Sequence, residues 1–522
     1  MSLVGKFATV GGATFASRLL GFARETMMAA ALGNGAMADV FYAAFRFPNL
    51  FRRLFAEGAF NAAFVPLFSR EIEENGVDGA KRFSEQVFGV LFSFLFVITV
   101  VMELAMPLLV RFIIAPGFAD DVEKFEMTVR LASVMFPYLI CMSLMAMMSG
   151  MLNSLHRYFA AAIAPVFLNF VLIGVLAYGI SVNADPEHMA RNLSWGVLAA
   201  GIIQLGVVYF DVRRAGMRLT FRLPKITPKI RRLVALAVPA AVTGGVIQIN
   251  QIIGQAVASG KDGAISALQY ADRLYQLPLG VVGVAGGVVL LPELSRALKA
   301  GDSSEASHIQ NRTIEFVLFL TVPAAFGLMV ISPEITRVLY ERGAFGPETT
   351  ALVAAIMTVY AFGLPAFALT KALQPAFYAR ENTKLPMRFT LVAVVINSAL
   401  AISLFPVLAE RGIALAEVVS GWTNVLLLAA TLIITGQLRF DKLLMRRGPL
   451  IIASAVVMAV AVRLAAGRMS GWFAPEAAFL QQLGGLLILL GLAAVVYFGL
   501  VLATGGVNRA LLGRLVKRRG KG

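Results

Sequence analysis

The chain has 522 residues, of which 58% are hydrophobic and only 15% are charged. A soluble domain carries about 25% charged residues, so this composition excludes an ordinary globular protein. Apolar runs of about 20 residues recur from one end to the other, and each is long enough to cross a bilayer as a helix. The net charge of +16 would suggest nucleic-acid binding, but Lys and Arg lie in loops between the apolar runs, which is typical of membrane topology.

The apolar runs predict an all-α polytopic membrane protein with fourteen transmembrane helices. Their approximate limits are 7–32, 36–62, 86–113, 128–152, 158–181, 193–211, 233–258, 264–293, 312–336, 350–374, 387–407, 413–435, 449–466 and 479–503. The second and eighth spans carry charged residues and would score poorly on hydropathy alone. The single cysteine, Cys141, lies inside an apolar run and excludes an intrachain disulfide.

Loop charges predict the orientation of the spans. The segment 213–232 holds eight Lys or Arg residues, and the loops after the tenth, twelfth and fourteenth spans are also basic. Loops after odd-numbered spans are poor in Lys and Arg, and the loop 114–127 holds four acidic residues against one lysine. The positive-inside rule therefore places both termini in the cytoplasm.

An internal repeat relates the two halves of the chain. The segment 64–70 resembles the segment 290–296, and two further pairs of motifs recur at offsets of 226 and 228 residues. These pairs are Pro107 and Arg111 with Pro333 and Arg337, and Pro137 and Asn169 with Pro365 and Asn397. Because odd-numbered spans match odd-numbered spans, the repeat is parallel, about an axis along the membrane normal.

The repeat predicts the domain organisation. Residues 1–212 form an N-lobe of spans one to six, and residues 233–438 form a C-lobe of spans seven to twelve. A basic cytoplasmic linker, 213–232, joins the lobes. Spans thirteen and fourteen, within 439–504, fall outside the repeat, and a basic cytoplasmic tail, 505–522, follows them.

The sequence offers no constellation for catalysis. The nearest approach to a phosphate loop, 254–262, has one residue too many between its glycines and Asp262 where Ser or Thr should bind Mg²⁺. Three scattered histidines and one cysteine give no metal-ligand cluster. We therefore expect a transporter without metal or cofactor rather than an enzyme.

Ionisable residues inside the predicted spans are the most informative feature. Each costs about 2.5–3.5 kcal/mol at mid-bilayer on insertion scales, so each must face a watery cavity or a partner. The first span carries Arg18, Arg24 and Glu25, the second carries Asp39, Arg46, Arg52, Arg53 and Glu57, and the eighth carries Asp272 and Arg273. Helical spacing aligns the second-span residues, except Arg52, in one stripe, and gives Arg18 and Glu25 a common face. Prolines 48 and 278 interrupt these helices and favour an open cavity.

The balance of these charges predicts an anionic substrate. Six arginines stand against four acids, an excess of +2, and the guanidinium fork matches phosphate oxygens. In the alternative interpretation the charges pair with one another and only lock helices together. That interpretation is favoured for Arg53 and Glu57, which lie near a span end. For Asp39 and Asp272, a structural or gating role is as well supported as a substrate contact.

Two motifs carry a family resemblance: Ser17-Arg18-Leu-Leu-Gly21-Phe-Ala-Arg24, and the stretch from Arg46-Phe-Pro48-Asn49 to Glu57. With Tyr270-Ala-Asp272-Arg273, they resemble the MurJ (MviN) family of lipid II flippases, in the multidrug/oligosaccharidyl-lipid/polysaccharide exporter superfamily. The resemblance covers the whole chain. It implies two six-helix lobes in a V shape, with two C-terminal helices that form a lipid-facing groove.

The resemblance also assigns roles. It implies that Arg18, Arg24, Arg52 and Arg273 hold the diphosphate and sugar of the head group, with Arg46 and Arg53 as further basic candidates. The acidic residues expected to gate the cavity or support it are Asp39, Asp272, Glu57 and Glu25. Further cavity residues are Ser17, Asn49 and Gln276. Some members have Glu where this chain has Gln276, so a proton or ion role is not carried over to that position.

The expected mechanism is alternating access in the bacterial inner membrane. The basic cavity takes the head group of lipid II from the cytoplasmic leaflet, the polyprenyl tail stays in lipid near spans thirteen and fourteen, and the lobes rock. Family members suggest coupling to membrane potential or to an ion gradient. We expect a monomer, with the cell-wall synthesis machinery as a candidate associate. The alternatives are a flippase for another polyprenyl-linked glycan, an ion-coupled drug exporter and a non-transporting scaffold.

Overall fold

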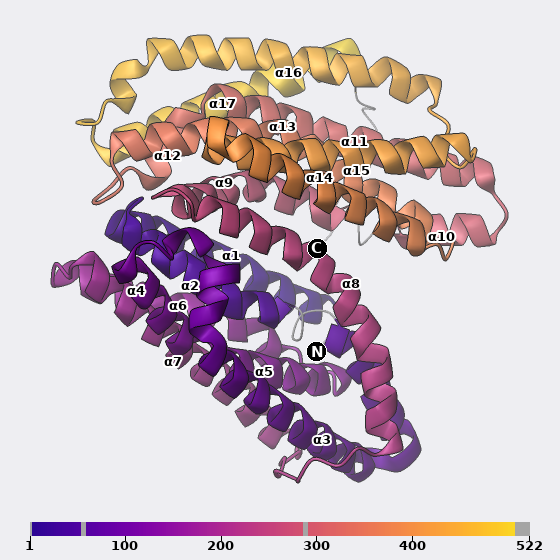
Figure 1. Ribbon diagram of the computed structural model, residues 1–522. Helices are drawn as coiled ribbons and strands as arrows, with labels where there is room; N and C mark the ends of the chain where they lie inside the picture. The colour runs from indigo at the N-terminus through magenta and orange to yellow at the C-terminus, as the bar shows by residue number, and fades with distance from the viewer. Residues whose placement is uncertain (1–2, 54–58, 286–290, 507–522) are drawn as a thin grey trace. The chain divides into compact units, whose positions relative to one another are not determined.

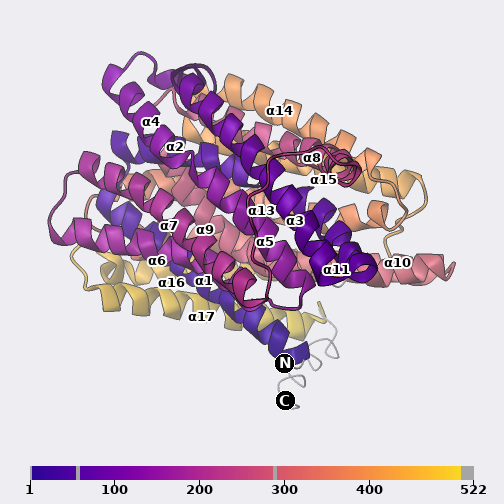
Figure 2. The same cartoon turned by 90° about the horizontal axis from the view of Figure 1, so that it is seen from below.

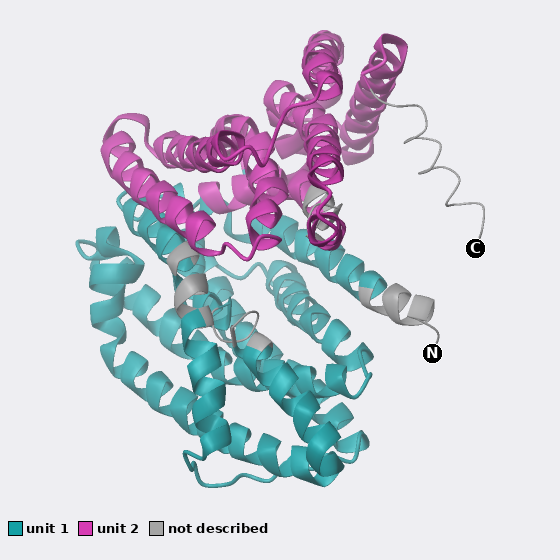
Figure 3. Cartoon of the chain, turned by 90° about the vertical axis from the view of Figure 1, so that its right-hand side faces the viewer, with its two compact units in different colours: residues 1–266, 342–345 teal, residues 267–341, 346–522 magenta. Residues whose placement is uncertain are grey.

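The computed structural model describes residues 3–53, 59–285 and 291–506 (Figure 1). These residues form helices joined by turns and contain no strand. The chain divides into two compact units, coloured teal and magenta in Figure 3. Unit 1 comprises residues 1–266 and 342–345, and unit 2 comprises residues 267–341 and 346–522.

Unit 1 holds the first eight α-helices. They are α1 (Leu3–Leu32), α2 (Ala36–Arg52), α3 (Ala59–Leu109), α4 (Val122–Met135), α5 (Tyr138–Ser154), α6 (Phe159–Ser181), α7 (Pro186–Arg214) and α8 (Pro228–Ala258). A π turn, η2 (Val110–Ile114), and a 3₁₀ turn, η3 (Pro116–Phe118), follow α3. Helix α9 (Ala264–Ala285) begins in unit 1 and continues in unit 2.

Helix α6 lies at the centre of one side of unit 1, where it packs against both α1 and α7. Figure 2 shows α6 and α7 side by side. Helix α5 packs against α3 and α7, and α2 packs against α4 and α7. The predicted fourth span consists of two helices, because Pro137 lacks the N–H that would continue the hydrogen-bond ladder from α4 into α5.

A strap, residues 215–227, crosses from α7 to α8 without helical structure and is fastened to α3. The buried carboxylate of Glu85 accepts hydrogen bonds from Thr220 Oγ1 at 2.8 Å and from Arg222 Nε at 2.6 Å. The ring of Phe221 lies edge-on to Phe88 and Phe92. The strap therefore holds the beginning of α8 close to α3, and α8 packs against α3 along its length.

Gly89 on α3 allows the backbone of the strap to pass close to this helix. A Cβ atom at position 89 would lie 2.0 Å from the carbonyl oxygen of Arg222, which is backbone and can shift only if the strap moves. We expect Gly89→Ala to destabilise the protein by about 1–3 kcal/mol, the usual cost of overpacking. Thermal unfolding in detergent measures this, with Gly174→Ala as the control because nothing lies within 4 Å of its Cβ position. Equal unfolding temperatures for the two variants would contradict the prediction.

Unit 2 continues from α9 and holds the remaining helices. They are α10 (Leu291–Lys299), α11 (Ser303–Val330), α12 (Ser332–Tyr340), α13 (Pro347–Tyr378), α14 (Lys384–Leu408), α15 (Glu410–Ile434), α16 (Lys442–Arg468) and α17 (Phe479–Thr504), with a 3₁₀ turn η5 (Ser470–Phe473). Helix α13 packs against α11 and α15, and α14 packs against α15. Helix α16 packs against α11 and α17, with buried residues such as Phe319, Met458 and Leu489 between them.

A charge cluster holds α16 against α11, and it consists of the buried Glu315 and Arg447 and the half-buried Arg312 and Asp441. Arg447 Nη1 donates to Glu315 Oε1 at 2.7 Å, and Arg312 pairs with both Glu315 and Asp441. Asp441 also caps α16 by accepting from the amide of Leu444. Burial alone would raise the pKa of Asp441, but these hydrogen bonds outweigh it and the pKa is lowered.

Each of the fourteen predicted spans overlaps a helix, and ten helical segments among the described residues are long and apolar enough to cross a membrane. The other four predictions fall on α1, α2, α8 and α9. Parts of the second and eighth predicted spans, residues 54–58 and 286–290, lie outside the described residues. The short helices α10 and α12 were not predicted. Large apolar side chains cover the surface: Leu104 and Leu480 are 81% and 77% exposed, as expected for a protein solvated by lipid.

The internal repeat is visible in the helix order. Helices α4, α6 and α7 begin 224 or 225 residues before α13, α14 and α15. The packing of α5 and α6 on α7 recurs as the packing of α13 and α14 on α15. The predicted lobe boundary places α8 with the C-lobe, whereas the compact units place it with unit 1, where it contacts α3, η2 and η3. Assignment of α8 to a moving lobe stays a prediction.

Candidate functional site

Two of the predicted site residues of unit 1, Arg24 and Glu25, form a buried polar cluster between α1, α2 and α6. Arg24 is 8% exposed, and its two terminal nitrogens donate to Asn169 Oδ1 and to Glu25 Oε2, each at 3.1 Å. Glu25 also accepts from the hydroxyl of Tyr42 at 3.0 Å. Among the described residues, Arg24 Nε has no hydrogen-bond partner. Asn169 and Glu25 thus hold the guanidinium in one orientation.

The cluster also fixes the approach of α6 to α1. Asn169 Nδ2 donates to the backbone carbonyl of Ser17 at 3.0 Å, so one amide bridges Ser17 and Arg24 along α1. Gly21 lies between these contacts, and its Cβ position would be 3.6 Å from Asn169 Oδ1. Arg18, one residue after Ser17, is exposed. The predicted common face of Arg18 and Glu25 therefore carries one exposed cation and one buried anion.

Asp39 makes a different set of contacts, at the start of α9. It is fully buried, and its carboxylate accepts from the amides of Gly263 at 2.6 Å and Ser266 at 2.8 Å, and from Ser266 Oγ at 2.7 Å. Carboxylates are favoured at helix N-termini because the unpaired amides point at them. The geometry supports the structural or gating interpretation of Asp39 over a direct substrate contact.

We expect Asp39→Asn to lower the free energy of unfolding by about 2 kcal/mol, because it weakens the junction between α2 and the start of α9. The amide nitrogen would face a backbone N–H, and that donor would lose its buried acceptor. Thermal unfolding of the purified protein checks the change, with Asp120→Asn as the control because Asp120 lies in an exposed loop. An unchanged unfolding temperature for Asp39→Asn would show that the carboxylate charge does not hold the junction.

The remaining residues of the predicted second-span site lie toward the end of α2. Asn49 Oδ1 accepts from Arg52 Nε at 2.8 Å, which orients the half-buried guanidinium of Arg52. Arg53 reaches α8, where Nη1 donates to Gln251 Oε1 at 3.4 Å. Arg46 is half-buried on α2, and Glu57 lies outside the described residues. Asp39 and Arg53 both turn toward α8 and the turn after it, in agreement with a common stripe on α2.

Three predicted site residues lie on α9 in unit 2. The side chain of Gln276 donates to Asp272, one turn earlier on the same helix, and Arg273 is half-buried beside them. Tyr275 is buried on α9 and stacks on Tyr360 of α13 with ring centroids 5.0 Å apart. Convergence of Arg273 with the arginines of α1 and α2 stays a prediction.

Two functional candidates were not predicted, Tyr42 and Asn169. Each is a polar side chain within a long apolar run, and that is the same signal that singled out the arginines. Asn169 was recognised only as a marker of the repeat. Its contact with Arg24 joins residues 145 positions apart, so no spacing rule could have connected them.

Unit 2 also contains an apolar groove of about 300 Å³. Helices α11, α13, α15 and α16 and the segment before α16 line it, through residues such as Leu318, Leu373, Val425 and Met445. The lining consists of apolar side chains and Gly448, so it offers dispersion contacts and no hydrogen-bonding side chain. Such a groove suits an acyl or polyprenyl chain.

Comparison with known proteins decides the family. The family model described as "Lipid II flippase MurJ" matches residues 28–484. A protein of Rhizobium tropici named "Probable lipid II flippase MurJ" is 63% identical over 519 residues, covering 99% of this chain and 97% of the relative. The chain belongs to the lipid II flippase MurJ family. A more distant MurJ, from Burkholderia cenocepacia and named "Lipid II flippase MurJ", is 32% identical over 97% of this chain and 98% of its own length.

Solved structures agree on the fold. A structure titled "Lipid II flippase MurJ, inward closed conformation" matches with a TM-score of 0.75 and 24% identity, over 94% of this chain and 99% of the other. An inward-facing multidrug resistance MATE family transporter of the MOP superfamily matches with a TM-score of 0.66 and 13% identity, over 81% and 95% of the two chains. These structures show the fold alone, whereas the names of the family and of its members, lipid II flippase, are those of a transporter rather than an enzyme.

Proposed function

We propose that this chain carries lipid II from the cytoplasmic to the periplasmic leaflet of the inner membrane by alternating access, with both termini in the cytoplasm. The observation that carries the proposal is the family match over residues 28–484, in a chain whose first helix holds Arg24 buried and oriented. The proposal needs no bond to be made or broken. It requires a polar path for an anionic head group and an apolar path for its lipid tail.

The head group is bound by Arg18, Arg24, Arg52 and Arg273. A diphosphate spreads charge over several oxygens, and guanidinium groups bind such oxygens bidentately. Arg24 and Arg52 are held by Asn169 and Asn49, at 3.1 and 2.8 Å, so little side-chain entropy remains to be lost on binding. Arg18 is exposed on α1 and supplies a second cation on the helix that carries Arg24.

The polyprenyl tail remains on the lipid side, and the apolar groove beside α16 is its candidate path. The charge cluster between α11 and α16 supports this path, because it fixes one wall of the groove next to Leu318 and Met445. Coupling to membrane potential or to an ion gradient would supply the driving force. A monomer is sufficient for this mechanism, and the cell-wall synthesis machinery is a candidate associate.

The sidedness of lipid II tests the proposal. Cells depleted of the protein receive a membrane-impermeant enzyme that cleaves lipid II from the periplasmic side. We expect cleavage to fall while total lipid II rises, and plasmid-borne wild-type protein to restore cleavage. Unchanged cleavage after depletion, with no second flippase induced, would mean that this chain does not supply the flipping step.

A further inference from the structure

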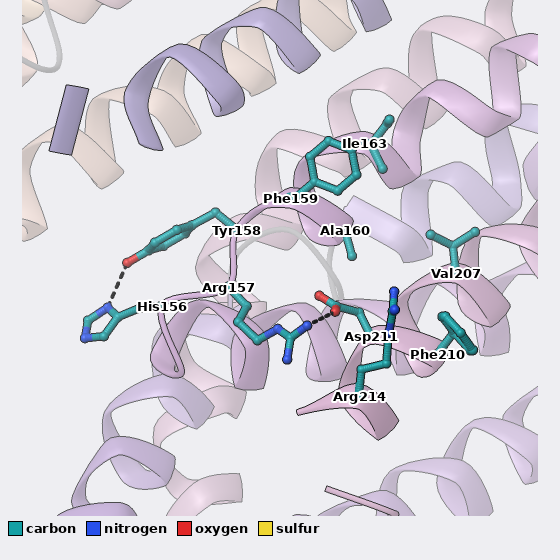
Figure 4. Close-up of a pocket in the computed structure, with 10 residues that line it drawn as sticks. All are labelled: His156, Arg157, Tyr158, Phe159, Ala160, Ile163, Val207, Phe210, Asp211 and Arg214. Atoms are coloured by element: carbon teal, nitrogen blue, oxygen red, sulfur yellow. Dashed lines mark hydrogen bonds and ion pairs between the residues drawn. The ribbon is translucent and has the colours of Figure 1, made fainter. Parts of the chain in front are cut away.

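A second pocket lies in unit 1, away from the polar cluster of α1 and α2. It has a volume of about 610 Å³ and lies where α5 turns into α6, beside the end of α7 (Figure 4). The turn contributes His156, Arg157 and Tyr158, and α7 contributes Phe210, Asp211 and Arg214. Both segments follow even-numbered spans, so the pocket lies at the end of unit 1 predicted to face the cytoplasm.

The charged side chains of the pocket leave one net positive charge. Arg157 pairs with Asp211 at 2.5 Å, as the dashed line in Figure 4 shows. Arg214 lies over the ring of Phe210, 5.3 Å from its centroid, and forms no ion pair among the described residues. Counting His156 as neutral, the two arginines and one aspartate sum to +1. A monoanion is the ligand that this balance fits.

The pocket is amphipathic. Phe159 and Phe210 are about 60% exposed, and Ile163 and Val207 continue the apolar lining along α6 and α7 toward the membrane interior. On the opposite side, His156 Nδ1 and the Tyr158 hydroxyl lie 3.1 Å apart and present hydrogen-bonding groups. A ligand that fills this site therefore has a polar, singly charged head and an apolar chain.

We propose that this pocket binds the phosphodiester head group of an anionic phospholipid from the cytoplasmic leaflet. A phosphodiester carries one negative charge, which matches the net charge of the lining, whereas a diphosphate carries more. Basic pockets between transmembrane helices on the cytoplasmic side bind such head groups. Arg214 contacts the phosphate, His156 and Tyr158 contact head-group hydroxyls, and one acyl chain runs along Phe159 and Ile163.

The test compares Arg214→Gln with Arg213→Gln in the full-length protein. The two substitutions remove the same charge from the same end of α7, but only Arg214 lines the pocket. Native mass spectrometry in detergent measures binding of phosphatidylglycerol, with phosphatidylcholine as the uncharged control. We expect Arg214→Gln to bind phosphatidylglycerol about fivefold more weakly than wild type, because one basic residue near a membrane surface contributes about 1 kcal/mol to lipid binding. We expect Arg213→Gln to bind as tightly as wild type.

Several outcomes would overturn the proposal. Equal losses for both variants would show that general surface charge attracts the lipid. Displacement of phosphatidylglycerol by soluble glycerol phosphate at similar concentration would identify a soluble phosphate as the ligand. Arg214→Lys should recover most of the binding, and its unfolding temperature separates loss of binding from loss of folding. The proposal is independent of transport, so both arginine variants are expected to restore growth.

Discussion

Replacing Arg24 with alanine is expected to abolish lipid II transport and also to lower the yield of folded protein. The first effect follows because a charge-assisted contact to the diphosphate is lost, worth about 1.5–3 kcal/mol or roughly a 10- to 150-fold lower rate. The second follows because Glu25, 1% exposed, would lose the guanidinium that donates to its Oε2. Removing one partner of a buried ion pair costs about 3–5 kcal/mol.

A double variant separates these effects. Glu25→Gln in the Arg24→Ala background removes the buried negative charge that Arg24 paired with, so the folded yield should recover while periplasmic cleavage of lipid II stays low. Arg24→Lys keeps the charge but lacks the guanidinium fork, and we expect intermediate transport. Arg130→Ala serves as the control, because the exposed pair of Arg130 with Glu126 is worth less than about 1 kcal/mol. Recovery of transport in the double variant would make Arg24 a purely structural residue.

The largest effect on stability is expected for Glu315→Ala. Glu315 is 3% exposed and is the shared acid between Arg312 and Arg447. Its loss removes the ion pair of the buried Arg447, while Arg312 keeps Asp441. We expect a loss of about 3–5 kcal/mol, measured by thermal unfolding in detergent. Because α16 would loosen from α11, cleavage of lipid II should fall as well.

Glu305→Ala is the matched control for this experiment. It removes the same charge from the same helix, but Glu305 is exposed in the first turn of α11, where a surface substitution changes stability by about 0.5 kcal/mol or less. A double variant, Glu315→Gln with Arg447→Gln, should recover part of the lost stability, since it removes a cation together with the anion. Similar unfolding temperatures for Glu305→Ala and Glu315→Ala would contradict a stabilising role for the cluster.

Arg447 is a basic residue of a predicted loop that the structure shows to be buried and paired. Arg447 belongs to the loop that follows the twelfth predicted span, yet it lies on α16 and pairs with Glu315, which is 132 residues away. A charge count over a loop cannot distinguish a solvated lysine from a buried arginine. That distinction depends on the carboxylate of a helix that is distant in sequence.

For Asp39, the sequence predicted the position on the helix but not the role of the side chain. Its helical spacing relative to Arg46 and Arg53 predicts one face of α2, but it left a structural or gating role and a substrate contact equally supported. The contacts with Gly263 and Ser266 favour the structural or gating role, because three hydrogen bonds already occupy most of the acceptor sites that a substrate donor would need.

The sequence alone determined the class of protein and the helices, and it contained the internal repeat that the helix order also shows. Run length, loop charge and repeated prolines are local properties, and a bilayer forces each apolar run to satisfy its backbone hydrogen bonds within one helix. Only the tertiary structure decided which charges pair. It joins Arg24 to Asn169 and Glu315 to Arg447, and it fastens the strap to Glu85. Such contacts depend on how helices pack, and the energies of packing are spread over many residues distant in sequence.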